Sequence, residues 1–316
     1  MFMKKMYFML IVLAVSLALS AQTQLYFNDF NAGAGSATIV GNGQIVMAAH
    51  PAFGNVFHNA AGGQGIRSNY MLLPDNVFAN LQTSGSKELS IGFWVNRGTA
   101  ANYYWTPIFT AYGAAPIAGA NTWPMMALQS RGWAQVNCTG WSDFTGTQNV
   151  KGVNTESTNW LDDNAWHYYT AVLTETNVKV YVDGVVMNEW ILTGNAAGSS
   201  VSGLFTNGGD LKYICLGGNQ AWNWADPDPA YMFDDVAVYS TALSTQQITN
   251  IMNTKITTSI ENQNVGMQVI KEEYYQLNGS KIQAGYRELI PGIYLKKSYM
   301  SDGSVINSKI LKTVIK

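Results

Sequence analysis

The side chains best suited to chemistry in this sequence are aromatic rings and carboxylates in its loops. The loop at 219–228 contains two indole rings and two carboxylates: Trp222, Trp224, Asp226 and Asp228. Indole rings stack on the apolar faces of sugars, and neighbouring polar groups bond the sugar hydroxyls. The combination predicts a carbohydrate site, to which we add the loop residues Trp141 and Trp105. The alternative is that long loops fold back and bury their own rings.

The other titratable residues do not predict hydrolytic chemistry. Retaining glycoside hydrolysis needs two carboxyl groups about 5 Å apart, whereas the glutamates here are scattered and mostly lie near turns. Asp162 and Asp163 are adjacent, so in a strand they would face opposite ways. The sequence has no Gly-x-Ser-x-Gly and no His-Glu-x-x-His motif. Catalysis is disfavoured, and an enzyme with an unfamiliar site stays an alternative.

The element expected at the centre of the fold is the run from Trp166 to Trp190. Within it, Val178, Val180 and Val182 alternate with polar or amphipathic residues, the pattern of a half-buried antiparallel strand. Asp183-Gly184 follows at once, and Asp-Gly between alternating runs is a strong hairpin signal, because both central residues of a type I′ turn need a positive φ. The run therefore predicts an antiparallel meander.

Short strands are expected throughout the first 240 residues, and 100–123 is expected to be a loop, because its prolines exclude a long central strand. The strands are expected at 25–30, 44–49, 70–73, 89–97, 125–129, 133–138, 211–216 and 232–239. One convincing helix begins at Ser244, which forms a capping box with Gln247. Its apolar stripe is Ile248, Ile251 and Met252. Many short strands with one short terminal helix predict an all-β sandwich.

The N-terminus has the pattern of a signal peptide. Lys4 and Lys5 precede an apolar run that ends in small residues, so we expect residues 1–21 to be removed and the chain to be secreted or held at the cell surface. No later stretch is long and apolar enough to span a membrane. The net charge of −2 argues against nucleic acid as a partner. Cys138 and Cys215 permit one disulfide or two buried thiols.

Composition changes near residue 253. Residues 22–252 form the predicted large domain, the polar stretch 253–263 is expected to be a linker, and 264–316 form a small β-sandwich-like module. Lys and Arg outnumber acidic residues in this module, while the large domain is acidic. Its Asn278-Gly279 and Asp302-Gly303 dipeptides are hairpin turns.

Several segments, taken in order, resemble the laminin-G-like, concanavalin A-like domains of bacterial secreted proteins. They are LYFNDFN (25–31), LSIGFWVNRG (89–98), AWHYYTAVLTETNVKVYVDGVVM (165–187), ICLGG (214–218) and FDDVAVYSTALSTQQITNIM (233–252). The resemblance implies a two-sheet antiparallel jelly roll. It also gives His167 a structural role within the Trp-His element. Catalytic members carry Glu-x-Asp-x-x-Glu on a concave strand, and this sequence has no such run.

The module resembles the sorting domain of the type IX secretion system of Bacteroidetes. The segments that carry this likeness are YYQLNGSKI (274–282), PGIYLKK (291–297) and DGSVINSKILK (302–312). It implies the type IX machinery as a partner. An ordinary small β-domain is the alternative.

The large-domain resemblance also implies a structural Ca²⁺, since related sandwiches often hold one with carbonyls and one or two carboxylates. We expect Asp29 at the end of the first strand and one of Asp234 and Asp235 in the last strand to be ligands, with carbonyls from 31–43. The alternative is that these carboxylates cap turns. The leading hypothesis is an exported, non-catalytic protein that binds a polysaccharide or glycoconjugate or mediates adhesion. The main alternative is a protein–protein interaction or structural surface module.

Overall fold

The structure is a computed structural model of the whole chain. It describes residues 23–62, 67–79, 81, 85–100, 106–113, 124–130, 134–136, 147–149, 161, 163–192, 201–208, 211–220, 227–263, 269–283, 285, 288–300 and 305–312. The chain divides into two compact units, Met1–Asn253 and Thr254–Lys316.

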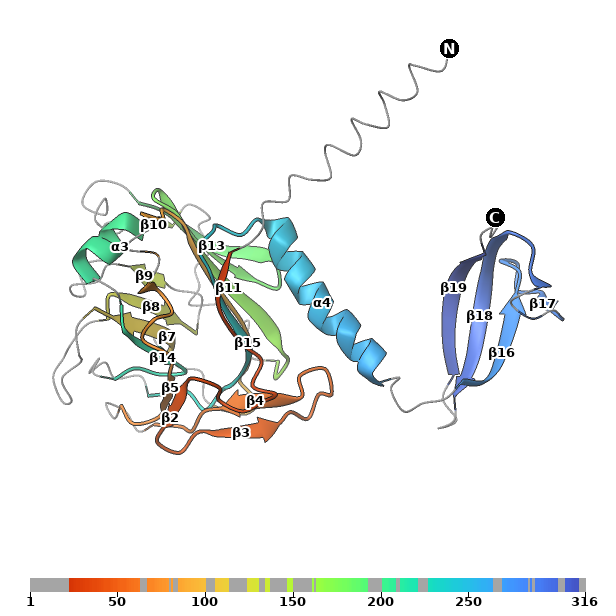
Figure 1. Ribbon diagram of the computed structural model, residues 1–316, viewed down its shortest axis with the longest axis horizontal. Helices are drawn as coiled ribbons and strands as arrows, with labels where there is room; N and C mark the ends of the chain where they lie inside the picture. The colour runs from red at the N-terminus through yellow and green to blue at the C-terminus, as the bar shows by residue number, and fades with distance from the viewer. Residues whose placement is uncertain are drawn as a thin grey trace, which may run out of the picture. The chain divides into compact units, whose positions relative to one another are not determined.

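The first unit contains two antiparallel sheets that face each other (Figure 1). The nine-stranded sheet has the order β10-β13-β12-β11-β6-β15-β4-β3, with β1 paired to β15. Its strands are β1 (Gln24–Asn28), β3 (Gln44–Met47), β4 (Asn55–His58), β6 (Leu89–Asn96), β10 (Thr147–Asn149), β11 (His167–Leu173), β12 (Asn177–Val182), β13 (Val185–Leu192) and β15 (Met232–Tyr239). The six-stranded sheet has the order β2-β5-β14-β7-β8-β9. Its strands are β2 (Thr38–Val40), β5 (Tyr70–Leu72), β7 (Pro107–Tyr112), β8 (Met126–Gln129), β9 (Ala134–Val136) and β14 (Tyr213–Leu216).

The main core lies between these sheets and follows the predicted alternation. In β6, Leu89, Ile91, Phe93 and Val95 are fully buried and belong to this core. The three valines of β12 join them from the same sheet. A two-sheet antiparallel jelly-roll sandwich is therefore confirmed.

The hairpin between β12 and β13 turns at the predicted dipeptide. Asp183 has φ 51° and Gly184 has φ 75°, so both central residues are left-handed, as a type I′ turn requires. The turn places β13 beside β12, and β12 pairs with β11 on its other side. The predicted meander is confirmed.

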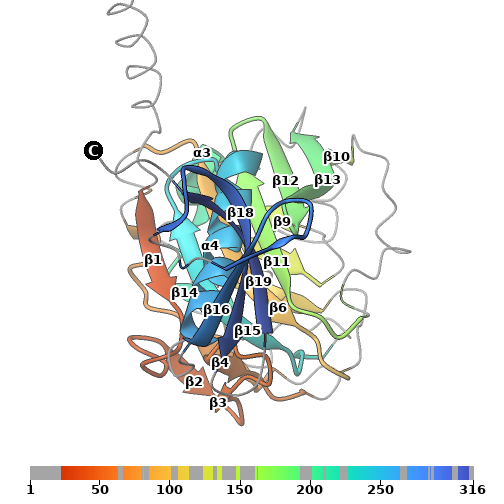
Figure 2. The same ribbon diagram turned by 90° about the vertical axis from the view of Figure 1, so that its right-hand side faces the viewer.

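The outer face of the nine-stranded sheet is covered by the start of helix α4 (Thr245–Gln263) (Figure 2). The capping box forms as expected: Ser244 N donates to Gln247 Oε1 at 2.8 Å, and Gln247 N donates to Ser244 Oγ at 3.3 Å. Ile248 is fully buried in a second apolar cluster with Trp94 and Tyr168. Apolar side chains of α4 are therefore packed against this outer face.

A second helix, α3 (Val201–Gly208), was not expected, since the sequence predicts one helix, which begins at Ser244. Its sequence has poor helix formers, but Val201, Leu204 and Phe205 fall on one face and are buried in the main core. Ser202 N donates to Glu175 Oε1 at 2.9 Å, which places a carboxylate at the helix N-terminus. Tertiary packing, rather than local propensity, selects this helix.

Strand β7 corrects the expectation of a loop at 100–123. It lies between β14 and β8, in the middle of the six-stranded sheet. Pro107 is its first residue, a position that a proline tolerates in a sheet, and the register shifts between Pro107 and Phe109. The prolines limit β7 to six residues without preventing a central strand.

The second unit is a single four-stranded antiparallel sheet of order β17-β16-β18-β19 in its described residues, rather than the two-layer module expected. Its strands are β16 (Val269–Tyr275), β17 (Lys281–Ile282), β18 (Gly292–Met300) and β19 (Val305–Lys312). Its small core consists of Tyr274, Leu289 and Tyr294. Helix α4 continues through the predicted linker to Gln263.

Candidate functional site

The candidate site is built on the outward face of the six-stranded sheet. Alternating residues of β5, β7, β8 and β14 enter the main core: Met71, Phe109, Ala111, Met126, Leu128, Ile214 and Leu216. The residues between them face outward and are mostly polar or aromatic: Tyr70, Thr110, Tyr112, Gln129 and Cys215. These side chains are buried, with Tyr70 9% exposed and the other four 0–1% exposed, so they support neighbouring segments of the chain and do not meet a ligand directly.

These outward side chains are bonded to the segment that follows β14. Thr110 Oγ1 donates to Gly218 O at 3.0 Å, and Tyr112 OH donates to Asn219 Oδ1 at 3.2 Å. Gln220 Nε2 donates to Tyr70 OH at 3.3 Å, while the Gln220 Oε1 atom has no hydrogen-bond partner in the described part of the chain. The start of the 219–228 loop is thus fixed on the sheet face.

The buried side chain of Asn59 also holds the segments on both sides of the 219–228 loop. Its side-chain Nδ2 donates to the carbonyls of Asn69 and Pro229, at 3.1 and 2.9 Å, and also to that of Gly217. Asn59 is 1% exposed. One buried amide therefore joins three segments that are far apart in the sequence.

Asp228 closes the far end of the loop. It is 1% exposed, and its Oδ2 accepts hydrogen bonds from the backbone N–H groups of Ser68 and Asn69, at 3.0 and 3.1 Å. Burial raises the pKa of the Asp228 carboxyl to about 6, against the lowering effect of these backbone bonds. Gly62 and Gly218 pack closely on it: a Cβ would lie 2.8 Å from Oδ2 at Gly62 and 3.0 Å from Oδ1 at Gly218. Both ends of the predicted ligand loop are thus anchored by buried polar contacts.

Comparison with known proteins identifies the fold family. Residues 64–249 match the family model described as the concanavalin A-like lectin/glucanases superfamily, of the laminin G type. The chain belongs to this superfamily. No curated protein matches it.

Two solved structures illustrate the likeness of fold. Domain 4 of the extracellular arabinanase AbnA from Geobacillus stearothermophilus, in complex with arabinotriose, has 19% identity over 72% of this chain and 98% of that chain, with a TM-score of 0.47. The binding domain of botulinum neurotoxin serotype D/C has 14% identity over 86% of this chain and 68% of that chain, with a TM-score of 0.41.

The predicted ligand residues of this laminin-G-type domain divide into two groups. Asp228 is buried at the base of the loop, where its described contacts are structural. The others lie outside the described residues: Trp105, Trp141, Trp222, Trp224 and Asp226. Their role in binding stays a prediction.

The residues predicted to hold calcium lie where the first and last strands meet. β1 pairs with β15 up to Asn28 opposite Val236, so Asp29 and Asp235 follow at the same end. Asp29 accepts hydrogen bonds from Asn31 N and Nδ2, both at 3.1 Å. Asp234 is fully buried, and its Oδ1 accepts the N–H of Asp235 at 2.9 Å. Carboxylates at this strand end fit calcium in chemical type, while the described residues contain no cluster of three or more His, Cys, Asp or Glu that could hold a metal.

The Trp-His element contains an ionic contact that the sequence analysis missed. His167 Nδ1 lies 2.7 Å from Asp183 Oδ2, and His167 Nε2 lies 3.0 Å from Asp163 Oδ1. Burial alone would lower the pKa of His167, but the hydrogen bonds and charges of the two aspartates outweigh it and raise the pKa. With both ring nitrogens facing carboxylates, His167 is a charged clamp rather than a general base. The Asp-Gly turn was the only sequence signal for Asp183.

Cys215 has no catalytic character. It is a free thiol, fully buried on the outward sheet face, and burial raises its pKa far above the ordinary value of 9.0. A thiol of this kind stays protonated and is a poor nucleophile. Cys138 lies outside the described residues.

Proposed function

We propose that this protein is an exported, non-catalytic carbohydrate-binding or adhesion protein, whose ligand contacts the loop aromatics beside the six-stranded sheet. The observation that carries the proposal is the 219–228 loop, which contains Trp222 and Trp224 and whose start is hydrogen-bonded to the buried side chains of Tyr70, Thr110 and Tyr112 on the six-stranded sheet. Membership of a superfamily that includes lectins supports it.

Binding is tested on a glycan array and by affinity gels in the presence of Ca²⁺. The matched variants are Trp222→Ala and Trp224→Ala, with Phe27→Ala as control, because Phe27 is a 51% exposed aromatic on the other sheet. Loss of one stacked ring is expected to weaken binding about tenfold, because that factor corresponds to the free energy of one aromatic contact. No binding to any glycan, or equal weakening by Phe27→Ala, contradicts the proposal. Release of reducing sugar from a bound polymer contradicts its non-catalytic part.

We further propose that Asp29 and Asp235 bind a structural calcium ion with nearby carbonyls. An ion that binds only the folded state raises the melting temperature. The measurement is thermal unfolding in Ca²⁺ and in a chelator, for the native chain and for Asp29→Asn. A melting temperature that is independent of Ca²⁺ contradicts the proposal.

Export through the periplasm by way of the C-terminal unit completes the proposal. The support is the N-terminal signal pattern and the resemblance of 274–312 to type IX sorting domains. No helix of the described residues is long and apolar enough to cross a membrane. In a host with type IX secretion, deletion of 264–316 is expected to leave the protein in the periplasm. Unchanged surface display of the truncated chain contradicts this role.

A further inference from the structure

One face of the sheet in the C-terminal unit carries no part of the small apolar core that the described residues form, and we call it the open face. The small core of Tyr274, Leu289 and Tyr294 lies on the other face. Cross-strand pairing places three rows of residues on the open face: Tyr275, Leu295 and Lys309; Glu273, Lys297 and Asn307; and Lys271, Tyr299 and Val305. Lys281, paired with Tyr275, extends the first row.

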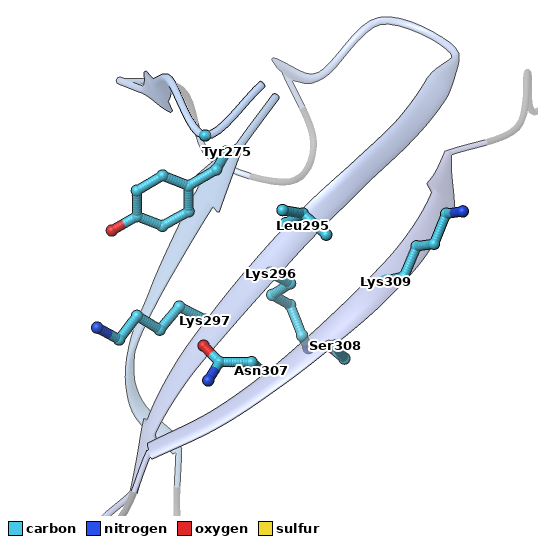
Figure 3. A pocket seen from close by; sticks show the side chains of 8 residues that line it. Tyr275, Leu295, Lys296, Lys297, Asn307, Ser308 and Lys309 are labelled. Carbon is cyan, nitrogen blue, oxygen red and sulfur yellow. The ribbon is translucent and has the colours of Figure 1, made fainter. Parts of the chain in front are cut away.

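This face contains a hollow of about 480 Å³, within the usual range for small-ligand sites. Tyr275, Leu295, Lys297, Asn307 and Lys309 are among the residues that line it. Figure 3 shows Tyr275, Lys297 and Asn307 extending to the same side of the sheet. An aromatic ring, two cations and an amide therefore surround one space.

Glu273 holds the two tyrosine rings in place. Its Oε2 accepts hydrogen bonds from Tyr275 OH at 2.7 Å and from Tyr299 OH at 2.9 Å. Its Oε1 lies 2.8 Å from Lys271 Nζ and 2.6 Å from Lys281 Nζ. The bonds of Lys271 and Lys281, with those of the tyrosines, hold the pKa of Glu273 well below its usual value of 4.5, so this carboxylate is ionised. One negative charge thus organises two rings and partly neutralises two lysines.

Lys297 and Lys309 supply positive charge for a ligand, and Lys297 Nζ also lies 5.3 Å from the centroid of the Tyr299 ring. Neither has a carboxylate within ion-pair distance among the residues the structure describes. Since Lys297 pairs with Asn307, Lys309 is its diagonal neighbour, and diagonal Cβ atoms in a sheet are about 7–8 Å apart. Two flexible ammonium groups at that spacing can reach one anionic group from both sides.

The charge of the whole unit agrees with this local pattern. Residues 254–316 contain nine Lys and Arg against five Asp and Glu, a formal charge of +4, whereas residues 1–253 have −6. The partner of the open face is therefore expected to be negatively charged.

The side chains on the face favour a sugar over a peptide. Tyr275 offers a fixed ring for stacking, and the Asn307 amide offers groups that bond hydroxyls. Leu295, which is 38% exposed, has lysines and a tyrosine around it and does not form a continuous apolar groove with other residues of the hollow. A bound peptide would need pockets for alternate side chains.

We propose that this face of the C-terminal unit is a second binding site, specific for an acidic polysaccharide, in which Tyr275 stacks on a sugar ring and Lys297 and Lys309 contact its acidic group. This site belongs to a different unit of the chain from the glycan site proposed above. It does not depend on that proposal.

The test measures binding of the full chain to polygalacturonate, with dextran as the neutral polysaccharide and poly-glutamate as the acidic peptide. The variants are Lys297→Gln with Lys309→Gln, and Tyr275→Ala. Lys312→Gln is the matched control, because Lys312 lies on the same strand and alternates to the opposite face. Thermal unfolding verifies that each variant is folded.

The native chain is expected to bind polygalacturonate and to bind dextran and poly-glutamate at least tenfold more weakly. The double lysine variant is expected to bind about tenfold more weakly, because it loses two exposed charge contacts of ordinary strength. Tyr275→Ala is expected to weaken binding several-fold. Lys312→Gln is expected to change the affinity less than twofold. If the double lysine variant still binds polygalacturonate as the native chain does, the binding belongs to the large unit and the proposal is overturned. Equal binding of poly-glutamate shows a general acidic-chain surface and also overturns it, as does the absence of binding.

Discussion

Replacing His167 by glutamine tests the ionic contact between the β12–β13 turn and the segment before β11. The imidazole lies between Asp183, at 2.7 Å, and Asp163, at 3.0 Å. His167 is 12% exposed, whereas Asp183 and Asp163 are 42% and 61% exposed. Water weakens ion pairs with exposed partners to about 1 kcal/mol each or less. We therefore expect His167→Gln to lower the free energy of unfolding by about 1–2 kcal/mol.

The pH dependence of this loss has a defined sign. The aspartates raise the pKa of His167 above 6.5 in the folded state. The stabilisation is therefore fully present below pH 6.5 and is lost as the pH rises through the folded-state value. The difference in unfolding free energy between the native chain and His167→Gln should be largest near pH 6 and should decrease toward pH 9.

The assay is urea unfolding followed by tryptophan fluorescence at pH 6, 7.5 and 9. His58→Gln is the matched control, because His58 is exposed on β4 and the same substitution there removes no described contact. A loss of about 1–2 kcal/mol corresponds to a decrease of roughly 2–8 °C in melting temperature for a domain of this size. A difference that is the same at all three pH values, or that grows toward pH 9, refutes the charged clamp.

Three other substitutions test the supports of the fold and of the candidate site. Asn59→Ala removes the amide bonded to three carbonyls and should lower the unfolding free energy by about 2–4 kcal/mol in urea titration; an effect below about 0.5 kcal/mol contradicts the role given to Asn59. Ile248→Ala leaves a cavity under α4 and should lower the free energy of unfolding by about 2–4 kcal/mol. The control Gln246→Ala changes an exposed residue of the same helix and should alter stability little. Equal effects of the two substitutions in urea titration would show that α4 is not packed on the sheet. Because the pKa of Asp228 is raised to about 6, its carboxyl makes the folded state less stable as the pH rises from 4 to 6, and Asp228→Asn should remove that part of the pH dependence; identical pH profiles of unfolding count against a buried ionisable Asp228.

Local sequence patterns specify much of the local geometry of this chain. Alternation in β6 and β12 specified which residues enter the core, because side chains of a strand point to opposite faces in turn. Asp183-Gly184 specified its turn, since both residues adopt the positive φ that few dipeptides accept. Ser244 and Gln247 specified where α4 begins, because a capping box satisfies backbone groups only three residues apart.

Only the tertiary structure decided which distant residues meet. Asn59 bonds to Pro229, 170 positions away, and Asp228 bonds to Ser68, 160 positions away. Helix α3 forms because Leu204 and Phe205 reach the core and Glu175 reaches its first turn, despite weak helix propensity. Such contacts depend on how two sheets stack and on where the loops cross them, and no local pattern encodes either. The rings that suggested a carbohydrate ligand were visible in the sequence, whereas the sheet face and the buried carboxylate that anchor their loop emerged only from the fold.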